Sequence, residues 1–321
     1  MGNVKVISKD NRSDDVFRAQ RVNGKYFYYL NKLILQAEKK SGPFLSPSQF
    51  PHIAIKVKTA HAPGHQVSAD LLDALLSFLS GRGFRSDQIM IVDRDEKTLI
   101  RGGFYSTGEK IGFYGKYRTF SSSSDTYYDP EWFHDSPMPP TIHDRSRFFL
   151  EYPNDRIKRL EEERKSYLPA ILFLKDVFWI NLSVATDHVN LGIDGAASNM
   201  TTGAISNHQR FLKKTTLAPA AVTEILAIPE FWEKRVYSIL DMSQYQFANG
   251  GQFDAEFLDS DPSLLLSENP ISLDYTALSI FKNIRKKNGF IERDESTLLL
   301  FKYAKELGLG AMNKIRVFDV Y

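Results

Sequence analysis

Short apolar runs alternate along the chain with segments whose apolar residues recur every three to four positions. Runs of the first kind lie at 52–57, 89–92, 177–184 and 236–240, and the last three are rich in β-branched residues. The second kind is clearest at 71–79, where Ser68 precedes a stripe of five leucines and glycines follow at 81 and 83. Strands that alternate with helices are typical of βαβ units. The pattern therefore predicts an α/β fold with a mostly parallel sheet.

Weaker signals predict further elements at both ends of the chain and in its middle. Ser13-Asp14-Asp15 precedes one long periodic segment, and Ser272 precedes another that ends in Arg285-Lys286-Lys287 and Asn288-Gly289, as helix start and stop signals do. We expect strands at 4–7, 264–266 and 315–320, and helices at 16–40, 167–176, 218–235, 272–287 and 296–307. The length of 321 residues fits one α/β domain over 1–321, or a domain with two lobes.

Residues 104–166 interrupt the alternation of strands and helices. Residues 104–152 hold 13 of the 41 aromatic residues, a run of four serines and prolines at 137, 139 and 140. Such a composition predicts an irregular, aromatic-rich insertion that packs by its own side chains. It would serve as a lid over a cleft, as a contact with a second subunit in a homodimer, or as an ordinary surface loop.

Charge and composition exclude several classes of protein. There are 41 lysines and arginines against 39 aspartates and glutamates, so the net charge of +2 argues against a nucleic-acid partner. No cysteine is present, which excludes a cysteine-ligated iron–sulfur cluster within this chain. No apolar run of about 18 residues exists, so we expect no membrane span. The first residues do not resemble a signal peptide, which fits a cytoplasmic protein or a mature exported form.

Motif searches give no known nucleotide site or nucleophile. The chain lacks a dinucleotide-binding glycine fingerprint, a phosphate-binding Gly-Lys-Ser/Thr loop, a Gly-x-Ser-x-Gly turn and a His-Glu-x-x-His pair. Candidate residues therefore come from position, because open α/β sheets bind ligands where parallel strands end.

Two cations and two imidazoles follow the strand predicted at 52–57. Lys56 and Lys58 are suited to holding an anion, and Asp93 follows the strand at 89–92 as a further ligand-binding candidate. His61 and His65 have the spacing of metal ligands on a helix, although Pro63 and Gly64 between them argue against a helix there. They are metal-binding candidates or solvated loop residues.

More polar residues follow the strand predicted at 177–184. Asp187 and His188 stand together, with Asp194, Asn199 and His208 further on. His188 is a candidate general base or metal ligand, Asn199 would orient substrate, and Asp187 would complete a metal site with the histidine pair. Adjacent side chains of a strand point apart, so Asp187 would equally serve as a helix cap.

Two later carboxylates complete the candidate catalytic set. Asp241 follows the strand at 236–240 and Asp274 lies early in the helix predicted at 272–287. Each would act in the site, or would cap or stabilise the start of a helix.

The string Ile180-Asn181-Leu182-Ser183-Val184-Ala185-Thr186-Asp187-His188 is followed by the string Gly195-Ala196-Ala197-Ser198-Asn199. These two strings resemble the strand and the turn of the family catalogued as domain of unknown function 362, with His188 and Asn199 matching. The likeness extends over most of the chain. Further likenesses lie at 238–241, 266–274 and 303–310.

The resemblance implies an α/β fold with a cleft and, because the family is often associated with iron–sulfur proteins, such a protein as a partner. The chain departs from the family pattern in two segments: Lys56-Val57-Lys58 replaces its Lys-Pro-Asn, and Thr186 replaces a lysine two residues before the histidine. The family has no settled reaction, so the likeness supports fold and cleft more than chemistry.

Two functions follow as expectations. The first is binding of a small anionic ligand in a cleft at strand ends, as an enzyme or enzyme-derived protein. A divalent metal would assist in one variant, of which nickel-dependent racemases are a remote example. The second is a non-catalytic binding or scaffold module with a degenerate site, which would work beside an iron–sulfur protein. Substrate and reaction stay open at this point.

Overall fold

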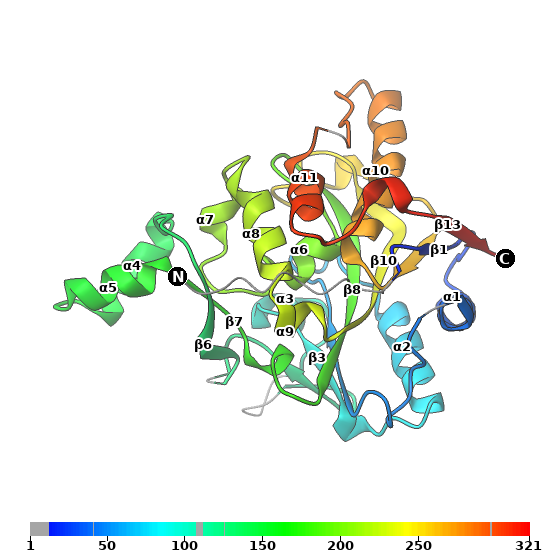
Figure 1. Cartoon of the computed structure of the whole chain (residues 1–321), viewed down its shortest axis with the longest axis horizontal. Helices are drawn as coiled ribbons and strands as arrows, with labels where there is room; N and C mark the ends of the chain where they lie inside the picture. The colour runs from blue at the N-terminus through cyan, green and yellow to red at the C-terminus, as the bar shows by residue number, and fades with distance from the viewer. Residues whose placement is uncertain (1–12, 41, 107–111, 125, 296) are drawn as a thin grey trace.

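The computed structural model describes residues 13–40, 42–106, 112–124, 126–295 and 297–321. Within these ranges one large sheet runs in the order β13-β1-β12-β10-β8-β2-β3-β5-β4, with β9 beside β8 and β11 beside β10 (Figure 1). The strands are β1 (Val16–Ala19), β2 (His52–Lys56), β3 (Ile89–Val92), β4 (Gly112–Tyr114), β5 (Tyr117–Phe120), β6 (Tyr128–Asp135), β7 (Lys165–Pro169), β8 (Val177–His188), β9 (Gly192–Asp194), β10 (Arg235–Gln246), β11 (Leu258–Asp259), β12 (Leu264–Ser267) and β13 (Val317–Val320). The helices are α1 (Tyr26–Lys40), α2 (Ala69–Gly81), α3 (Glu96–Arg101), α4 (Ile142–Glu151), α5 (Arg156–Arg164), α6 (Ala196–Met200), α7 (Gln209–Leu212), α8 (Leu217–Leu226), α9 (Pro229–Trp232), α10 (Pro270–Lys287) and α11 (Leu299–Glu306).

The centre of the sheet is parallel. Strands β10, β8, β2, β3 and β5 pair with one another in parallel, whereas β12, β4, β9 and β11 pair antiparallel to their neighbours. The α/β fold predicted from the alternation of apolar patterns is therefore confirmed.

Helices cover both faces of the parallel strands. Ile53 and Ile55 of β2 pack in the apolar cluster that contains residues of α1 and α2, whereas Ala54 packs in the cluster that contains residues of α6, α8, α10 and α11. Because both faces are covered, eleven of the twelve residues of β8 are buried. This explains why the central strands read as nearly continuous apolar runs without alternation.

The helix predicted at 16–40 is in fact a strand followed by a helix. Val16–Ala19 forms β1, which pairs with β12 and β13, and α1 begins only at Tyr26. Between them Asn23 and Gly24 have positive φ angles of 40° and 77°, a conformation that ends the strand and that a helix cannot contain. The strand predicted at 4–7 lies outside the described residues.

Two other predicted helices are interrupted. Residues 165–169 form β7, which pairs with β6, and only a short 3₁₀ turn follows at 170–172. The helix predicted at 218–235 stops at Leu226, restarts as α9 with Pro229 at its first position, and gives way to β10 at Arg235.

Asn269, rather than Ser272, caps α10: its side chain accepts a hydrogen bond from the Ile271 N–H.

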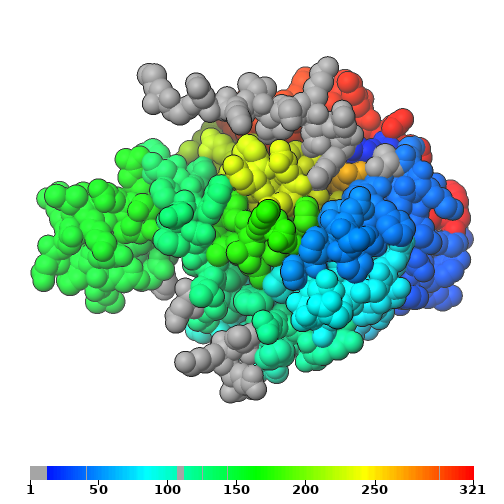
Figure 2. Space-filling model, turned by 60° about the horizontal axis from the view of Figure 1, so that its bottom comes forward, coloured from blue at the N-terminus to red at the C-terminus, as the bar shows by residue number. Residues whose placement is uncertain are grey.

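The aromatic-rich insertion contains regular elements. Strands β4 and β5 extend the edge of the main sheet, and β6 and β7 form a separate two-stranded sheet. Helices α4 and α5 connect β6 to β7 and project from one end of the molecule (Figures 1 and 2). None of the helices in the described ranges is long and apolar enough to cross a lipid bilayer.

Candidate functional site

A buried lysine at the end of β2 organises the first group of polar residues. The Lys56 Nζ is fully buried and donates to Asp93 Oδ1 at 2.7 Å, Asn199 Oδ1 at 2.9 Å and the Val57 carbonyl at 2.9 Å. Asp93 lies at the adjacent end of β3, and Asn199 comes from α6. The structure thus brings together three of the residues expected at the strand ends. Burial lowers the pKa of Lys56, and the charge of Asp93 opposes that effect.

The carboxylate of Asp93 has its own set of donors. The Thr59 N–H and Oγ1 donate to its Oδ2 at 3.0 and 2.6 Å, and the Arg94 N–H donates to Oδ1 at 2.7 Å. Together with Lys56, these donors hold the carboxylate in a fixed orientation. Its charge is therefore used within the protein.

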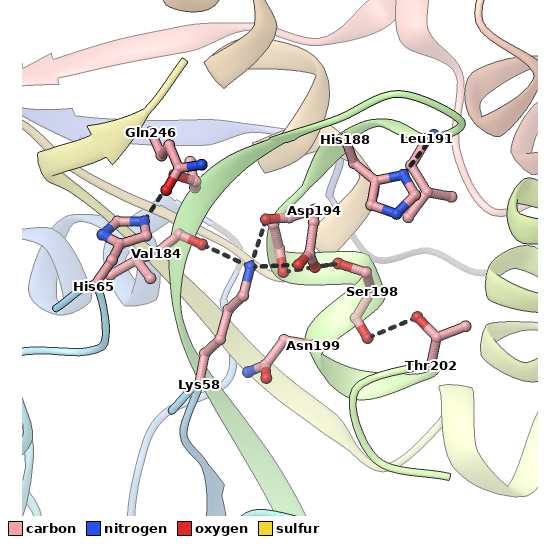
Figure 3. Close-up of polar contacts among 12 residues, drawn as sticks. Lys58, His65, Val184, His188, Leu191, Asp194, Ser198, Asn199, Thr202 and Gln246 are labelled. Carbon is pink, nitrogen blue, oxygen red and sulfur yellow. Dashed lines mark hydrogen bonds and ion pairs between the residues drawn. The ribbon is translucent and has the colours of Figure 1, made fainter. Parts of the chain in front are cut away.

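A second lysine forms a parallel arrangement two residues further on (Figure 3). The Lys58 Nζ donates to the carbonyls of Val184 and Asp194 and forms an ion pair with Asp194 Oδ2 at 3.1 Å. The Ser198 hydroxyl donates to the other oxygen of the Asp194 carboxylate. Burial alone would raise the pKa of Asp194, but Lys58 and Ser198 hold it well below its usual range. Asp194 is an anion at neutral pH.

A small cavity of about 50 Å³ lies between these two lysine groups. About 10–15 Å³ of such space is enough for one water molecule, so the cavity has room for several waters or for one carboxylate-sized group. Its lining combines two cations and three carboxylates with uncharged residues of loops and helices: Lys58, Thr59, Ala60, Asp93, Arg94, Asp95, Thr98, Asp194, Asn199 and Gly203.

Arg94 differs from the two lysines in having donors to spare. One guanidinium nitrogen, Nη1, donates to the Thr202 carbonyl at 2.9 Å. No other acceptor holds the guanidinium within the described part of the chain, whereas Lys56 and Lys58 each have three acceptors for their three protons. Arg94 is therefore the cation that can offer N–H groups to a ligand in the cavity.

His188, the expected general base, has its Nδ1 atom occupied. The N–H groups of Asn190 and Leu191 both donate to Nδ1, each at 3.2 Å. Burial lowers the pKa of His188, although the charge of Asp194 raises it. The neutral ring then carries its proton on Nε2. In this arrangement His188 can donate a hydrogen bond from Nε2 but has no free nitrogen to accept a proton. To act as a general base, the ring would have to give up its hydrogen bonds at Nδ1.

The residues expected to bind a metal do not form a ligand set. His65 Nε2 lies 3.1 Å from the Ala185 carbonyl, and burial lowers the pKa of the ring to about 4. Asp187 forms ion pairs with Arg293 at 2.8 Å and with Arg285 at 3.2 Å. His61 and His65 face each other through a single antiparallel backbone bridge. In the described ranges, no three histidine or carboxylate side chains are arranged to hold a metal ion.

Asp241 lies away from the cavity, so its expected place in the site is corrected. Its carboxylate faces α1 and accepts hydrogen bonds from the Tyr26 hydroxyl at 2.7 Å and from the Ser243 N–H at 2.9 Å. Tyr26 belongs to the helix layer opposite α6. Since Asn199 approaches from α6, the sheet itself separates Asp241 from it.

Asp274 is buried beside the site and positions α6. Its two oxygens accept the N–H groups of Ala196 and Ala197, at 2.6 and 2.9 Å, which are the first two residues of that helix. Burial raises the pKa of Asp274 to about 7, against the effect of these two hydrogen bonds. Because α6 carries Ser198 and Asn199, Asp274 is a positioning residue.

Sequence reasoning left several site residues without a role, among them Thr59, Arg94, Asp194 and Ser198. Two of them had an available signal, because Arg94 directly follows the strand-terminal Asp93 and Ser198 directly precedes Asn199. Thr59 and Asp194 lie in the loop after β2 and at the end of β9, and only the fold brings them to the cavity.

Comparisons with known proteins add little to this geometry. No family model and no curated protein matches the chain. A crystal structure of a protein from Thermotoga maritima is similar over 71% of this chain, with 11% sequence identity and a TM-score of 0.34. The matched region spans about half, 52%, of that protein's length.

Proposed function

We propose that the protein binds a small anionic ligand in the cavity at the carboxyl ends of β2 and β3, beside β9 and α6. One observation carries the proposal: Arg94 lines the cavity, and only one of its guanidinium nitrogens, Nη1, has an acceptor in the described part of the chain. A guanidinium donates two parallel hydrogen bonds to a carboxylate or phosphate, which makes it suited to this class of ligand.

The rest of the cavity favours a ligand with a polar group beside its anionic end. Asp194 lines the same cavity as an anion, and its carboxylate could accept a hydrogen bond from a hydroxyl or amino group of the ligand. Asn199 and Thr98 add amide and hydroxyl groups to the lining. The cavity itself has room for the anionic end alone, so the remainder of the ligand would lie toward solvent.

Ligand-induced stabilisation tests this proposal. Wild-type protein is screened in thermal unfolding with small carboxylates, hydroxycarboxylates and phosphates, because a ligand that binds only the folded state raises the unfolding midpoint. We expect the unfolding midpoint to rise with ligand concentration. Arg94→Gln should need a ligand concentration about tenfold higher or more for the same rise. Arg118→Gln, at an exposed arginine of β5, removes the same charge outside the lining and is the matched control.

A second candidate function is a binding or scaffold role without a ligand in this cavity. It is favoured by the complete internal pairing of Lys56 and Lys58, which stabilises the strand ends without any ligand. An absence of any thermal shift in wild-type protein, with the same result for His188→Ala and Arg94→Gln, would support this candidate over the first.

A further inference from the structure

The arm, defined as residues 137–164 with α4 and α5, extends away from the sheet (Figures 1 and 2). It starts and ends at one place, because the Ser136 N–H donates to the Arg164 carbonyl at 3.0 Å. None of the three apolar clusters of the described residues includes a residue of the arm. Ile142, Leu150 and Ile157 are 87%, 81% and 74% exposed. Phe148 of α4 is 4% exposed, so the arm buries one ring, but it contributes nothing to the three clusters and presents apolar surface.

A hollow of about 740 Å³ lies on this arm. Its lining includes Met138, Phe149 and Leu160 together with Arg145, Arg156, Arg159 and Arg164, against one carboxylate, Glu163. The surface is therefore apolar with an excess of positive charge. Such a surface fits an occupant that combines acidic and apolar side chains.

Two of the four arginines are available to a partner. Arg164 is ion-paired with Asp135, and the Arg159 guanidinium lies over the Phe149 ring. Arg145 and Arg156 are exposed, and neither forms an ion pair within the described ranges. Their charges are solvated in the isolated chain.

The same chain carries a segment with the complementary character. The acidic segment, defined as 253–261, contains four carboxylates at 254, 256, 259 and 261, and no lysine or arginine occurs anywhere between Arg235 and Lys282. None of the four carboxylates is ion-paired among the residues that the structure describes. Phe253 in the segment is 39% exposed, and Glu256 is exposed beside it.

We propose that the hollow of the arm binds the acidic segment of a second copy of this chain. Arg145 and Arg156 would pair with its carboxylates, and Phe253 would pack against the apolar part of the hollow. In a two-fold dimer each chain gives its arm and receives its partner's, so the contact is made twice. Doubling the contact also moves a modest patch toward the area that stable dimers bury. The proposal does not depend on a ligand in the sheet cavity.

Sedimentation velocity over a range of protein and salt concentrations tests the proposal. We expect a reversible dimer whose dissociation constant rises with salt, because exposed charge pairs are screened. Arg145→Glu with Arg156→Glu should weaken the dimer by about tenfold or more. Arg118→Glu reverses an exposed charge outside the arm and should leave the dimer unchanged.

A charge exchange distinguishes this contact from any other use of the arm. The chain with Glu256→Arg and Asp259→Arg should form a weaker dimer when it is studied by itself. Mixing it with the chain that carries Arg145→Glu and Arg156→Glu should restore dimerisation, because opposite charges then face each other again. A chain that stays monomeric at every concentration overturns the proposal. A dimer that neither arginine reversal nor the exchange affects overturns it too, and binding of the wild-type monomer to an acidic peptide would then assign the hollow to another partner.

Discussion

At the scale of single residues, Lys56 is the group whose removal should be most costly. Lys56→Met leaves the carboxylate of Asp93 buried without its cation, and breaking a buried ion pair in this way costs about 3–5 kcal/mol. Urea unfolding measures the loss. The double variant Lys56→Met, Asp93→Asn removes both charges and should lose clearly less than the single variant. An equal loss in both would show that the charge pairing is unimportant.

Asp274 should make folding stability depend on pH. Its usual pKa of 3.8 is raised to about 7 in the folded chain, so between these values the folded state keeps a proton that the unfolded state has lost. The protonated carboxyl group therefore stabilises the folded chain fully below pH 3.8. This stabilisation falls as the pH rises toward 7 and does not change further above pH 7. In the window from pH 5 to 7 the carboxyl group should therefore destabilise the fold increasingly, by a few kcal/mol at most, at about 1.4 kcal/mol per pKa unit.

Urea unfolding of wild type and Asp274→Asn at pH 5, 6, 7 and 8 checks this expectation. The difference in unfolding free energy between the two proteins should shift in favour of Asp274→Asn up to about pH 7 and then level, because asparagine does not titrate. A difference that is constant over the whole range would mean that Asp274 keeps an ordinary pKa.

The outcome at Asp241 shows what the sequence could predict about single residues. The sequence predicts that Asp241 lies at the end of an apolar run, and it predicts the same for Lys56 and Asp93. The sequence does not predict on which face of the sheet the Asp241 side chain lies, because a strand buried on both faces has no alternation of polar and apolar residues. Asp93 faces the cavity and Asp241 faces α1 for reasons that only the register of the sheet defines.

At the scale of elements, the cap of α10 should matter more than the cap of α2. The Asn269 side chain caps α10 through the Ile271 N–H and also donates to the Leu309 carbonyl and to Asp14. Ser68 makes only an exposed capping bond to the Asp70 N–H. We expect Ser68→Ala to cost about 1 kcal/mol and Asn269→Ala about 2–4 kcal/mol in urea unfolding, since buried partners are left unsatisfied. Equal costs would mean that the extra bonds contribute nothing.

The ends of elements were harder to predict than their existence. The helix predicted at 16–40 and the helix predicted at 167–176 each contained a segment that pairs as a strand with residues distant in the sequence. The local pattern of apolar residues contains no information about a strand partner such as Leu266, which lies about 250 residues from Phe17. Where turn signals were strong, as at Ser68, Gly81 and Asn288, predicted and observed ends agree within a few residues.

At the scale of the whole molecule, the fold should not depend on the arm. The carbonyls of Met138 and Glu163 accept from the same Arg210 nitrogen at 2.9 and 2.8 Å, so the two oxygens lie less than about 6 Å apart. Replacing residues 140–161 by a short Gly-Asn linker should therefore close the chain without moving β6 or β7. No arm residue belongs to the three apolar clusters, but Phe148, which is 4% exposed, is removed with the arm. We therefore expect the free energy of unfolding to change by about 2 kcal/mol or less.

A pair of identical substitutions provides the control for that deletion. Phe149→Ala changes a ring of the arm that is 56% exposed, whereas Phe301→Ala changes a ring of α11 that is 4% exposed and packed in the core. We expect about 3–5 kcal/mol for Phe301→Ala and well under 1 kcal/mol for Phe149→Ala. If the deletion or Phe149→Ala abolished cooperative unfolding, the arm would be part of the folding unit, and its exposed surface could no longer be assigned to contact between molecules.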